Sequence, residues 1–152
     1  MKQVKKSVLL WYSAHEMYEL VTGFERYPEF LPWCERAEVI ARDADAVTAR
    51  LSLSFMGVQQ SFTTRNIEIA DERVQMELVD GPFSRLDGVW RFLPLNKPGS
   101  EAAASACKIE FELRYAFSSK TLEAVVSPAF DRIANTFVDS FVQRAEAVYG
   151  AR

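Results

Sequence analysis

Histidine and cysteine are scarce in this chain, and their scarcity narrows the chemistry it can perform. The sequence holds one histidine, His15, and two cysteines, Cys34 and Cys107. A single histidine cannot build a histidine-based metal cluster, and any Ser-His-acid or Cys-His arrangement would have to use that residue. Ser13 and Glu16 have capping-box spacing, which predicts that His15 lies in the exposed first turn of a helix. The sequence therefore predicts no catalytic residue and no metal site.

Other absences exclude further classes of protein. The six glycines form neither a G-x-G-x-x-G run nor a P-loop, so the chain has no nucleotide-binding fingerprint. No apolar run approaches the ~18 residues that a membrane span requires, and residues 1–6 are too short and too charged for a signal peptide. The two cysteines lack metal-ligand spacing, so we expect both to be reduced and buried, as in a cytosolic protein.

Length, hydropathy and charge are those of an ordinary soluble domain. The 152 residues are 49% hydrophobic and 26% charged, which predicts one domain over residues 1–152 that buries ~70% of its unfolded surface. A net charge of −3 argues against non-specific nucleic-acid binding, so no DNA partner is expected. A local basic patch remains compatible with this net charge.

The most distinctive segment is ERYPEFLPW at residues 25–33, which combines aromatic residues with two prolines. Each proline favours extended backbone at the residue before it, Tyr27 or Leu31, so an ordinary helix or strand is not expected. We therefore predict a stiff apolar connector. Two interpretations are open for it: a loop that caps the core, or a surface presented to a ligand.

Beyond the connector, apolar residues recur at every second position, which is typical of strands with one buried face. Short turn signals such as Met56-Gly57 separate the runs. A turn is expected at residues 96–99, and a flexible loop over residues 100–105. Strands joined by short turns predict an antiparallel meander. The alternating runs cover residues 47–55, 58–64, 74–78, 86–92 and 107–117.

Signals of helical structure occur near both ends of the chain. A short helix is predicted to begin at Ser13 and to end at Gly23. Near the C-terminus, apolar residues recur every three or four positions from Val126 to Val148, so a long helix should lie with one face on the sheet. Pro128 leaves two alternatives: a fresh helix begins at Ser127, or one long helix continues through a kink.

Four segments, in the expected order, resemble the START-like family of coenzyme Q-binding proteins and bacterial ribosome-association toxins. This family is also catalogued as polyketide cyclase/dehydrase or oligoketide cyclase. The segments are ERYPEFLPWC at 25–34, FMGVQQSFTTR at 55–65, DGPFSRLDGVWRF at 80–92 and SPAFDRIANTFVDSFVQRA at 127–145. The resemblance implies an α+β helix-grip fold, in which a curved antiparallel sheet wraps around a long C-terminal helix, with short helices after the first strand. Asn66 and Gly88 depart from the family pattern and are expected to enlarge or polarise the interior.

A curved sheet that grips one helix tends to leave a gap, and the resemblance implies a cavity there for ubiquinone or a similar isoprenoid lipid. No cofactor is expected to be covalently bound. Gln60, Thr64 and Tyr115 are inward polar groups that could hydrogen-bond a quinone carbonyl or be satisfied by backbone or water. The connector would form the cavity mouth, with Trp33 as a movable anchor, while many inward side chains would simply be core. The candidate ligand-binding residues are Tyr27, Phe30, Leu31, Trp33, Phe55, Gln60, Phe62, Thr64, Met76, Trp90, Phe92, Phe111, Tyr115, Phe130 and Phe137.

The resemblance suggests three functional classes, all compatible with a bacterial cytoplasmic protein that has transient contact with the inner membrane. The favoured class is a non-catalytic protein that delivers ubiquinone or a related lipid to respiratory or biosynthetic partners. The alternative is a toxin that binds the large ribosomal subunit and blocks subunit joining. An enzyme of the cyclase or dehydrase type ranks last, because it needs an inward acid. The acids considered are Glu68, Glu110 and Glu112, predicted on the outer face, and Asp80 and Asp87, predicted at a turn or outside. The basic candidates for ribosome contact are Lys2, Lys5, Lys6, Arg26, Arg36 and Arg42.

Overall fold

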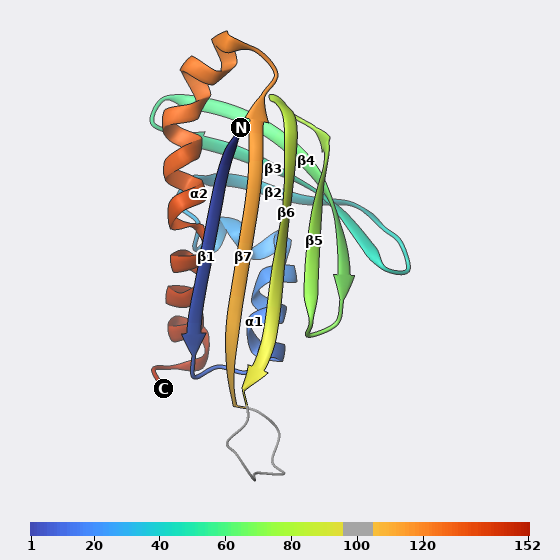
Figure 1. Cartoon of the computed structure of the whole chain (residues 1–152), viewed down its shortest axis with the longest axis vertical. Helices are drawn as coiled ribbons and strands as arrows, with labels where there is room; N and C mark the ends of the chain where they lie inside the picture. Colours follow the sequence, from blue (N-terminus) through green and yellow to red (C-terminus); the bar gives the residue numbers. More distant parts are fainter. Residues whose placement is uncertain (96–104) are drawn as a thin grey trace.

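The structure is a computed structural model that describes residues 1–95 and 105–152. The turn predicted at residues 96–99 and the loop predicted over residues 100–105 lie outside this range, apart from residue 105. Seven strands and three helical segments make up the described part (Figure 1). The strands are β1 (Lys2–Leu10), β2 (Cys34–Arg42), β3 (Ala46–Phe55), β4 (Val58–Ile69), β5 (Arg73–Asp80), β6 (Phe83–Leu95) and β7 (Ala106–Phe117). The helices are α1 (Ala14–Thr22), the 3-10 helix η1 (Phe24–Glu29) and α2 (Lys120–Tyr149).

All seven strands belong to one antiparallel sheet with the order β1-β7-β6-β5-β4-β3-β2. From β2 to β7 each strand pairs with the next along the chain, which confirms the meander. β1 instead pairs with β7, from Lys2 opposite Tyr115 to Leu10 opposite Cys107. α1 and η1 therefore connect the two edges of the sheet. The strands β2, β3 and β4 run across the direction of β1, β7 and β6, so the sheet is strongly curved (Figure 1).

The long helix α2 lies along the concave side of this sheet, as the helix-grip expectation requires (Figure 1). It begins after Ser119, whose side-chain oxygen accepts a hydrogen bond from the Leu122 amide at 3.1 Å. The helix continues through Pro128, so the alternative in which a fresh helix begins at Ser127 is wrong. Val148 was placed on the buried stripe but is 48% exposed.

Local signals place α1 and the β3–β4 hairpin as predicted. The expectation of extended backbone at Tyr27 is wrong, because Tyr27 and Pro28 lie inside the 3-10 helix η1. Ser13 and Glu16 form both hydrogen bonds of the capping box at the start of α1, and Gly23 follows its last residue. The β3–β4 hairpin turns at Met56 and Gly57, both of which have positive φ. Both cysteines are free and buried. Within the described residues, no helix is long and apolar enough to cross a membrane.

Candidate functional site

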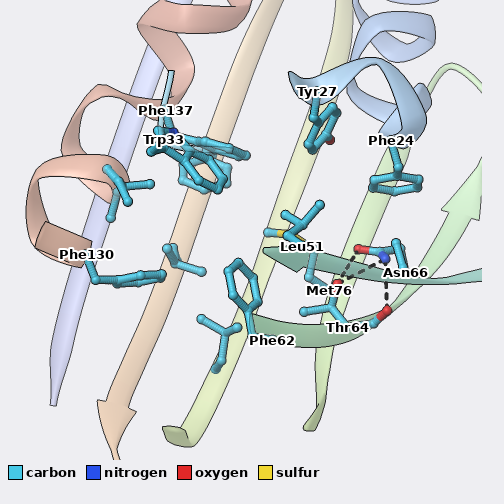
Figure 2. A pocket seen from close by; sticks show the side chains of 16 residues that line it. Phe24, Tyr27, Trp33, Leu51, Phe62, Thr64, Asn66, Met76, Phe130 and Phe137 are labelled. Carbon is cyan, nitrogen blue, oxygen red and sulfur yellow. Dashed lines mark hydrogen bonds between the residues drawn. The ribbon is translucent and has the colours of Figure 1, made fainter. Parts of the chain in front are cut away.

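A cavity lies between the concave face of the sheet, α2 and the connector that contains η1 (Figure 2). Its walls are almost entirely apolar, and its volume is about 60 Å³. This volume accommodates a few waters and is well below the ~300–1,000 Å³ of pockets that hold drug-sized ligands. The lining residues are Phe24, Tyr27, Trp33, Ala49, Leu51, Phe62, Thr64, Asn66, Met76, Leu86, Phe111, Leu113, Phe130, Ile133, Ala134 and Phe137.

The connector covers this cavity and is anchored to the core through Tyr27. The Tyr27 ring packs edge-on against Phe141 of α2, with centroids 5.4 Å apart, and its hydroxyl donates a hydrogen bond to the Val21 carbonyl. Burial raises the pKa of the Tyr27 hydroxyl well above its usual value. The segment therefore caps the core, as the first interpretation holds, and it also supplies Tyr27 and Trp33 to the cavity wall. Presentation to a ligand stays a prediction.

An aromatic cluster centred on Phe137 forms the α2 side of the site. Its ring centroid lies 6.1 Å from Trp33, 5.7 Å from Trp90 and 5.7 Å from Phe111. Trp90 is 1% exposed and lies behind Phe137 and Phe111, so it is core and does not line the cavity. Trp33 from the connector and Phe137 from α2 therefore lie next to each other in the cavity wall, as Figure 2 shows.

The polar wall of the cavity consists of Thr64 and Asn66 on β4 (Figure 2). The Asn66 amide nitrogen donates to the Val47 carbonyl at 3.1 Å and to the Thr64 hydroxyl at 3.1 Å. The Thr64 hydroxyl in turn donates to the Asn66 side-chain oxygen at 3.4 Å, a long and weak contact. The nitrogen is thus satisfied by protein groups, while the side-chain oxygen of Asn66 retains capacity to accept a hydrogen bond.

Tyr115, predicted as an inward polar ligand, does not line the cavity. Its hydroxyl donates to the Asp131 carboxylate at 2.5 Å, and the same carboxylate accepts from Ser127 and pairs with Lys2. This cluster ties β1, β7 and α2 together. Burial opposes ionisation of Asp131, but the hydrogen bonds from Lys2, Tyr115 and Ser127 and the charge of Lys2 hold its pKa below the usual value.

The structure brings eight of the fifteen candidate residues to the cavity wall and leaves seven elsewhere. Of those seven, Leu31, Trp90, Phe92 and Tyr115 are buried core, whereas Phe30, Phe55 and Gln60 are partly exposed. The cavity walls also include residues that were not predicted, most of them small or aliphatic. The eight at the wall are Tyr27, Trp33, Phe62, Thr64, Met76, Phe111, Phe130 and Phe137. The additional residues are Phe24, Ala49, Leu51, Asn66, Leu86, Leu113, Ile133 and Ala134.

Glu68 was predicted on the outer face, and this prediction is wrong. The pairing of β4 with β5 is uninterrupted from Asn66 to Glu68, so the two side chains point to the same, inner face. One Glu68 carboxylate oxygen is buried and has no hydrogen-bond partner among the described residues. Burial raises the pKa of this carboxyl, with Arg42 opposing the rise. Glu68 lies outside the cavity wall, and no acidic residue of the described chain lines it.

The six basic candidates for ribosome contact do not form one patch. Lys2, Lys5 and Lys6 lie on β1 at one edge of the sheet, whereas Arg36 and Arg42 lie on β2 at the other edge. Most of them also have acidic partners, which reduces their net charge. The pairs are Lys2 with Asp131, Lys5 with Glu112 at 3.7 Å, Arg36 with Glu38 at 2.9 Å and Arg42 with Glu25 at 3.3 Å.

Comparison with known families decides which one this architecture represents. Residues 10–142 match the family model described as "Polyketide cyclase / dehydrase and lipid transport". The chain belongs to this family.

Relatives in the polyketide cyclase/dehydrase and lipid transport family carry two kinds of name. The chain is 37% identical over 147 residues to the ribosome association toxin RatA of Pseudomonas aeruginosa, with 97% of each chain covered. It is 38% identical over 152 residues to RatA of Escherichia coli K12, covering 100% of this chain and 92% of the relative. The mitochondrial coenzyme Q-binding protein COQ10 homolog B of Xenopus laevis is 28% identical over 149 residues, covering 97% of this chain and 59% of the relative.

Solved structures confirm the START-like fold of the family. A START superfamily protein from Mycobacterium smegmatis superimposes with a TM-score of 0.76 at 18% identity, covering 96% of this chain and 98% of that one. An aromatase/cyclase from Streptomyces superimposes with a TM-score of 0.65 at 15% identity, covering 98% and 88%. The same fold thus supports proteins with enzyme names and proteins without them.

The two departures from the family pattern have different effects in the structure. Asn66 polarises the cavity, as expected, because it is 1% exposed and its side chain lies in the wall. Gly88 does not enlarge the cavity, because the Met76 side chain opposite it occupies the space that a side chain at residue 88 would fill. The cavity is therefore polar at Asn66 on β4, and it gains no space at Gly88 on β6.

Proposed function

We propose that this chain is a non-catalytic, cytoplasmic bacterial protein that associates with the large ribosomal subunit and blocks its joining to the small subunit. The observation that carries the proposal is the similarity, at 37% identity over 97% of both chains, to a protein named ribosome association toxin. Full coverage matters here, because an association surface can lie anywhere on the molecule and is retained only if the whole domain is retained.

The small volume of the cavity bears on the choice between ribosome association and quinone binding. With about 60 Å³ open, the cavity cannot hold a quinone ring unless the connector or α2 moves. A surface function needs no such movement. This favours the ribosome over the quinone, which is the reverse of the order suggested by the sequence resemblance alone.

Co-sedimentation tests the ribosome proposal. Purified chain is mixed with separated large and small subunits at low and at physiological salt, and each mixture is spun through a sucrose cushion. We expect the chain to pellet with large subunits at close to one copy per subunit, and to stay in the supernatant with small subunits. Equal pelleting with both subunits, or none with either, would overturn the proposal.

A quinone or related lipid is the second candidate, favoured by the apolar cavity with its single polar wall at Thr64 and Asn66. A lipid tail there would replace water against aromatic rings at about 25 cal/mol per Å² of apolar area. If this function applies, the protein would be peripheral to the inner membrane during transfer. It differs from the ribosome proposal in depending on the cavity and not on the surface.

Tryptophan fluorescence tests the second candidate, because Trp33 lines the cavity and Trp90 lies directly behind Phe137. Titration with a short-chain ubiquinone should give saturable quenching that the cavity-filling variant Leu51→Trp weakens after its own signal is subtracted. Leu9→Trp, at an exposed position, is the matched control that should leave the titration unchanged. Quenching that is linear, and equal in urea-unfolded protein, would reject quinone binding.

A further inference from the structure

The convex face of the sheet carries an excess of positive charge, although the chain as a whole has a net charge of −3. On β1 and β3 to β7, residues that alternate with buried neighbours point away from α2. Basic residues outnumber acidic ones two to one among them. The basic residues are Lys5, Arg50, Arg65, Arg73, Arg85, Arg91, Lys108 and Arg114. The acidic residues are Glu77, Asp87, Glu110 and Glu112.

A polar hollow of about 400 Å³ lies in the middle of this face, across β5, β6 and β7. Gln75 and Val89, which are cross-strand partners, lie at its centre. The longer side chains of Arg73 and Arg91 lie to one side, and Arg114 lies to the other. The hollow is separate from the apolar cavity, since the sheet itself lies between the two.

Arg73 and Arg91 stand directly opposite each other on β5 and β6. Like charges at paired positions of a sheet repel, and a structure normally compensates them with nearby carboxylates. None of the ion pairs among the described residues involves Arg73, Arg91 or Arg114. Three guanidinium groups therefore border one hollow without a carboxylate in ion-pair contact.

The acidic residues of the hollow offset these charges only in part, because Asp87, which stands opposite Arg114, and Glu112 each pair with a basic residue outside the hollow. Asp87 pairs with Arg85 at 2.7 Å, and Glu112 pairs with Lys5 at 3.7 Å. Glu77 is the remaining acid in the wall. Glu110, the cross-strand partner of Arg91, lies just outside the hollow. With Lys5 and Arg85 also counted, five basic and four acidic residues surround the hollow, so its surroundings are net positive, as an anion site requires.

We propose that the hollow bounded by Arg73, Arg91 and Arg114 receives phosphate groups of ribosomal RNA, so that the convex face of the sheet is the side of the molecule that meets the ribosome. This inference rests on the proposed function and adds to it the contacting surface and the chemistry of the partner. Arginine is suited to the role because its planar guanidinium donates two parallel hydrogen bonds to one phosphate. The strands hold the three side chains on a rigid platform.

The test compares two variants with equal loss of charge. The first is Arg73→Gln, Arg91→Gln, Arg114→Gln. The control is Lys120→Gln, Arg132→Gln, Arg152→Gln, which removes three exposed basic residues outside the hollow. Binding to large subunits is measured by co-sedimentation over a salt series, and binding to a short RNA duplex by fluorescence anisotropy. Urea unfolding of each variant checks that it is folded.

We expect the hollow variant to bind large subunits at least ten-fold more weakly than the parent, and the control to bind within about two-fold. Each lost phosphate contact should reduce the log–log salt slope by about 0.7–0.9, so the slope should fall by roughly 2 to 3. If the parent binds subunits and the hollow variant binds equally well, this inference is wrong while the proposed function stands. If the parent fails to bind subunits, the proposed function is wrong, and the RNA duplex then tests the hollow alone. Tighter duplex binding by the parent than by the hollow variant would still support an RNA site in the hollow. Any other result with the duplex would reject that site.

Discussion

Met76 on β5 and Gly88 on β6 are cross-strand partners, and the terminal methyl of Met76 lies 2.6 Å from where a Cβ on residue 88 would be. The same Cβ would lie 3.0 Å from the Glu112 carbonyl oxygen, which belongs to the backbone. The glycine thus permits a large side chain of the cavity wall to cross its neighbouring strand.

Gly88→Ala is therefore expected to destabilise the fold by roughly 1–3 kcal/mol, as overpacking of a core does. Met76 can move, but the backbone carbonyl cannot move as easily. In a Met76→Ala background the same change should cost less, because the shortest of the close contacts is gone. Urea unfolding of the four proteins of this cycle measures the coupling, and strictly additive effects would show that Met76 does not pack against residue 88.

Phe137→Asp tests whether α2 is clamped onto the sheet. The ring contacts Trp33, Trp90, Phe111 and Phe141, so the variant loses a large aromatic side chain and places a charge in their midst. We expect a loss of at least about 3–5 kcal/mol in the free energy of unfolding.

The control for this variant is Val125→Asp, on the same helix but 58% exposed. It should change the free energy of unfolding by less than about 0.5 kcal/mol. Urea unfolding followed by tryptophan fluorescence compares the two. Equal stability of the Phe137 and Val125 variants would mean that this face of α2 is not buried.

The Asp131 cluster should contribute stability that depends on pH. Because the folded protein holds the pKa of Asp131 below its usual value, its contribution is fully present above the pKa of the unfolded chain. It is lost as the pH falls through the lower folded value. Asp131→Asn should therefore be less stable than the parent at pH 7, with the difference narrowing below about pH 4. Melting temperatures from pH 2.5 to 7 measure this, and a constant difference would show that the ion pair with Lys2 is not the cause.

Glu68 should show the opposite behaviour. Its pKa is raised, mainly by burial, so its ionised form opposes folding above the pKa of the folded protein. As the pH falls and the carboxyl is protonated, this unfavourable contribution disappears. Glu68→Gln is thus expected to be more stable than the parent at pH 7 and about equally stable near pH 3. A Glu68→Gln protein that melts below the parent at pH 7 would indicate a stabilising partner for the carboxylate.

Much of the fold could be predicted from residues whose burial alternates strictly. Val47, Ala49, Leu51 and Leu53 on β3 are all buried, as the period of two requires. The edge strands were harder to locate. β2 is mostly exposed, with register shifts between Cys34 and Arg36 and between Val39 and Ala41, which remove the alternation. On β1 the charged residue Lys2 lies on the inner side, where it pairs with Asp131. The sequence of β1 therefore lacks the alternation of apolar and polar residues that is typical of a strand with one buried face.

The candidate site was only partly predictable, because parity along a strand shows which face a side chain points to but not what it touches there. Trp90 and Phe111 both point inward, yet Phe111 reaches the cavity and Trp90 is enclosed by rings. The signal for Asn66 was present: continuing the inward positions from Phe62 through Thr64 leads directly to Asn66 and Glu68. The arginines of the convex face each look like ordinary solvated residues in the sequence, and only the strand order brings Arg73, Arg91 and Arg114 around one hollow.

The most direct test of the central claim is a subunit-joining assay. Purified large and small subunits are mixed in magnesium buffer, and light scattering records the formation of 70S particles as the chain is titrated in. A protein that binds the large subunit and blocks joining predicts a dose-dependent fall in scattering that saturates near one chain per large subunit, with the heat-unfolded chain inactive. An unchanged amplitude and rate of joining at a ten-fold excess of folded chain would contradict the account.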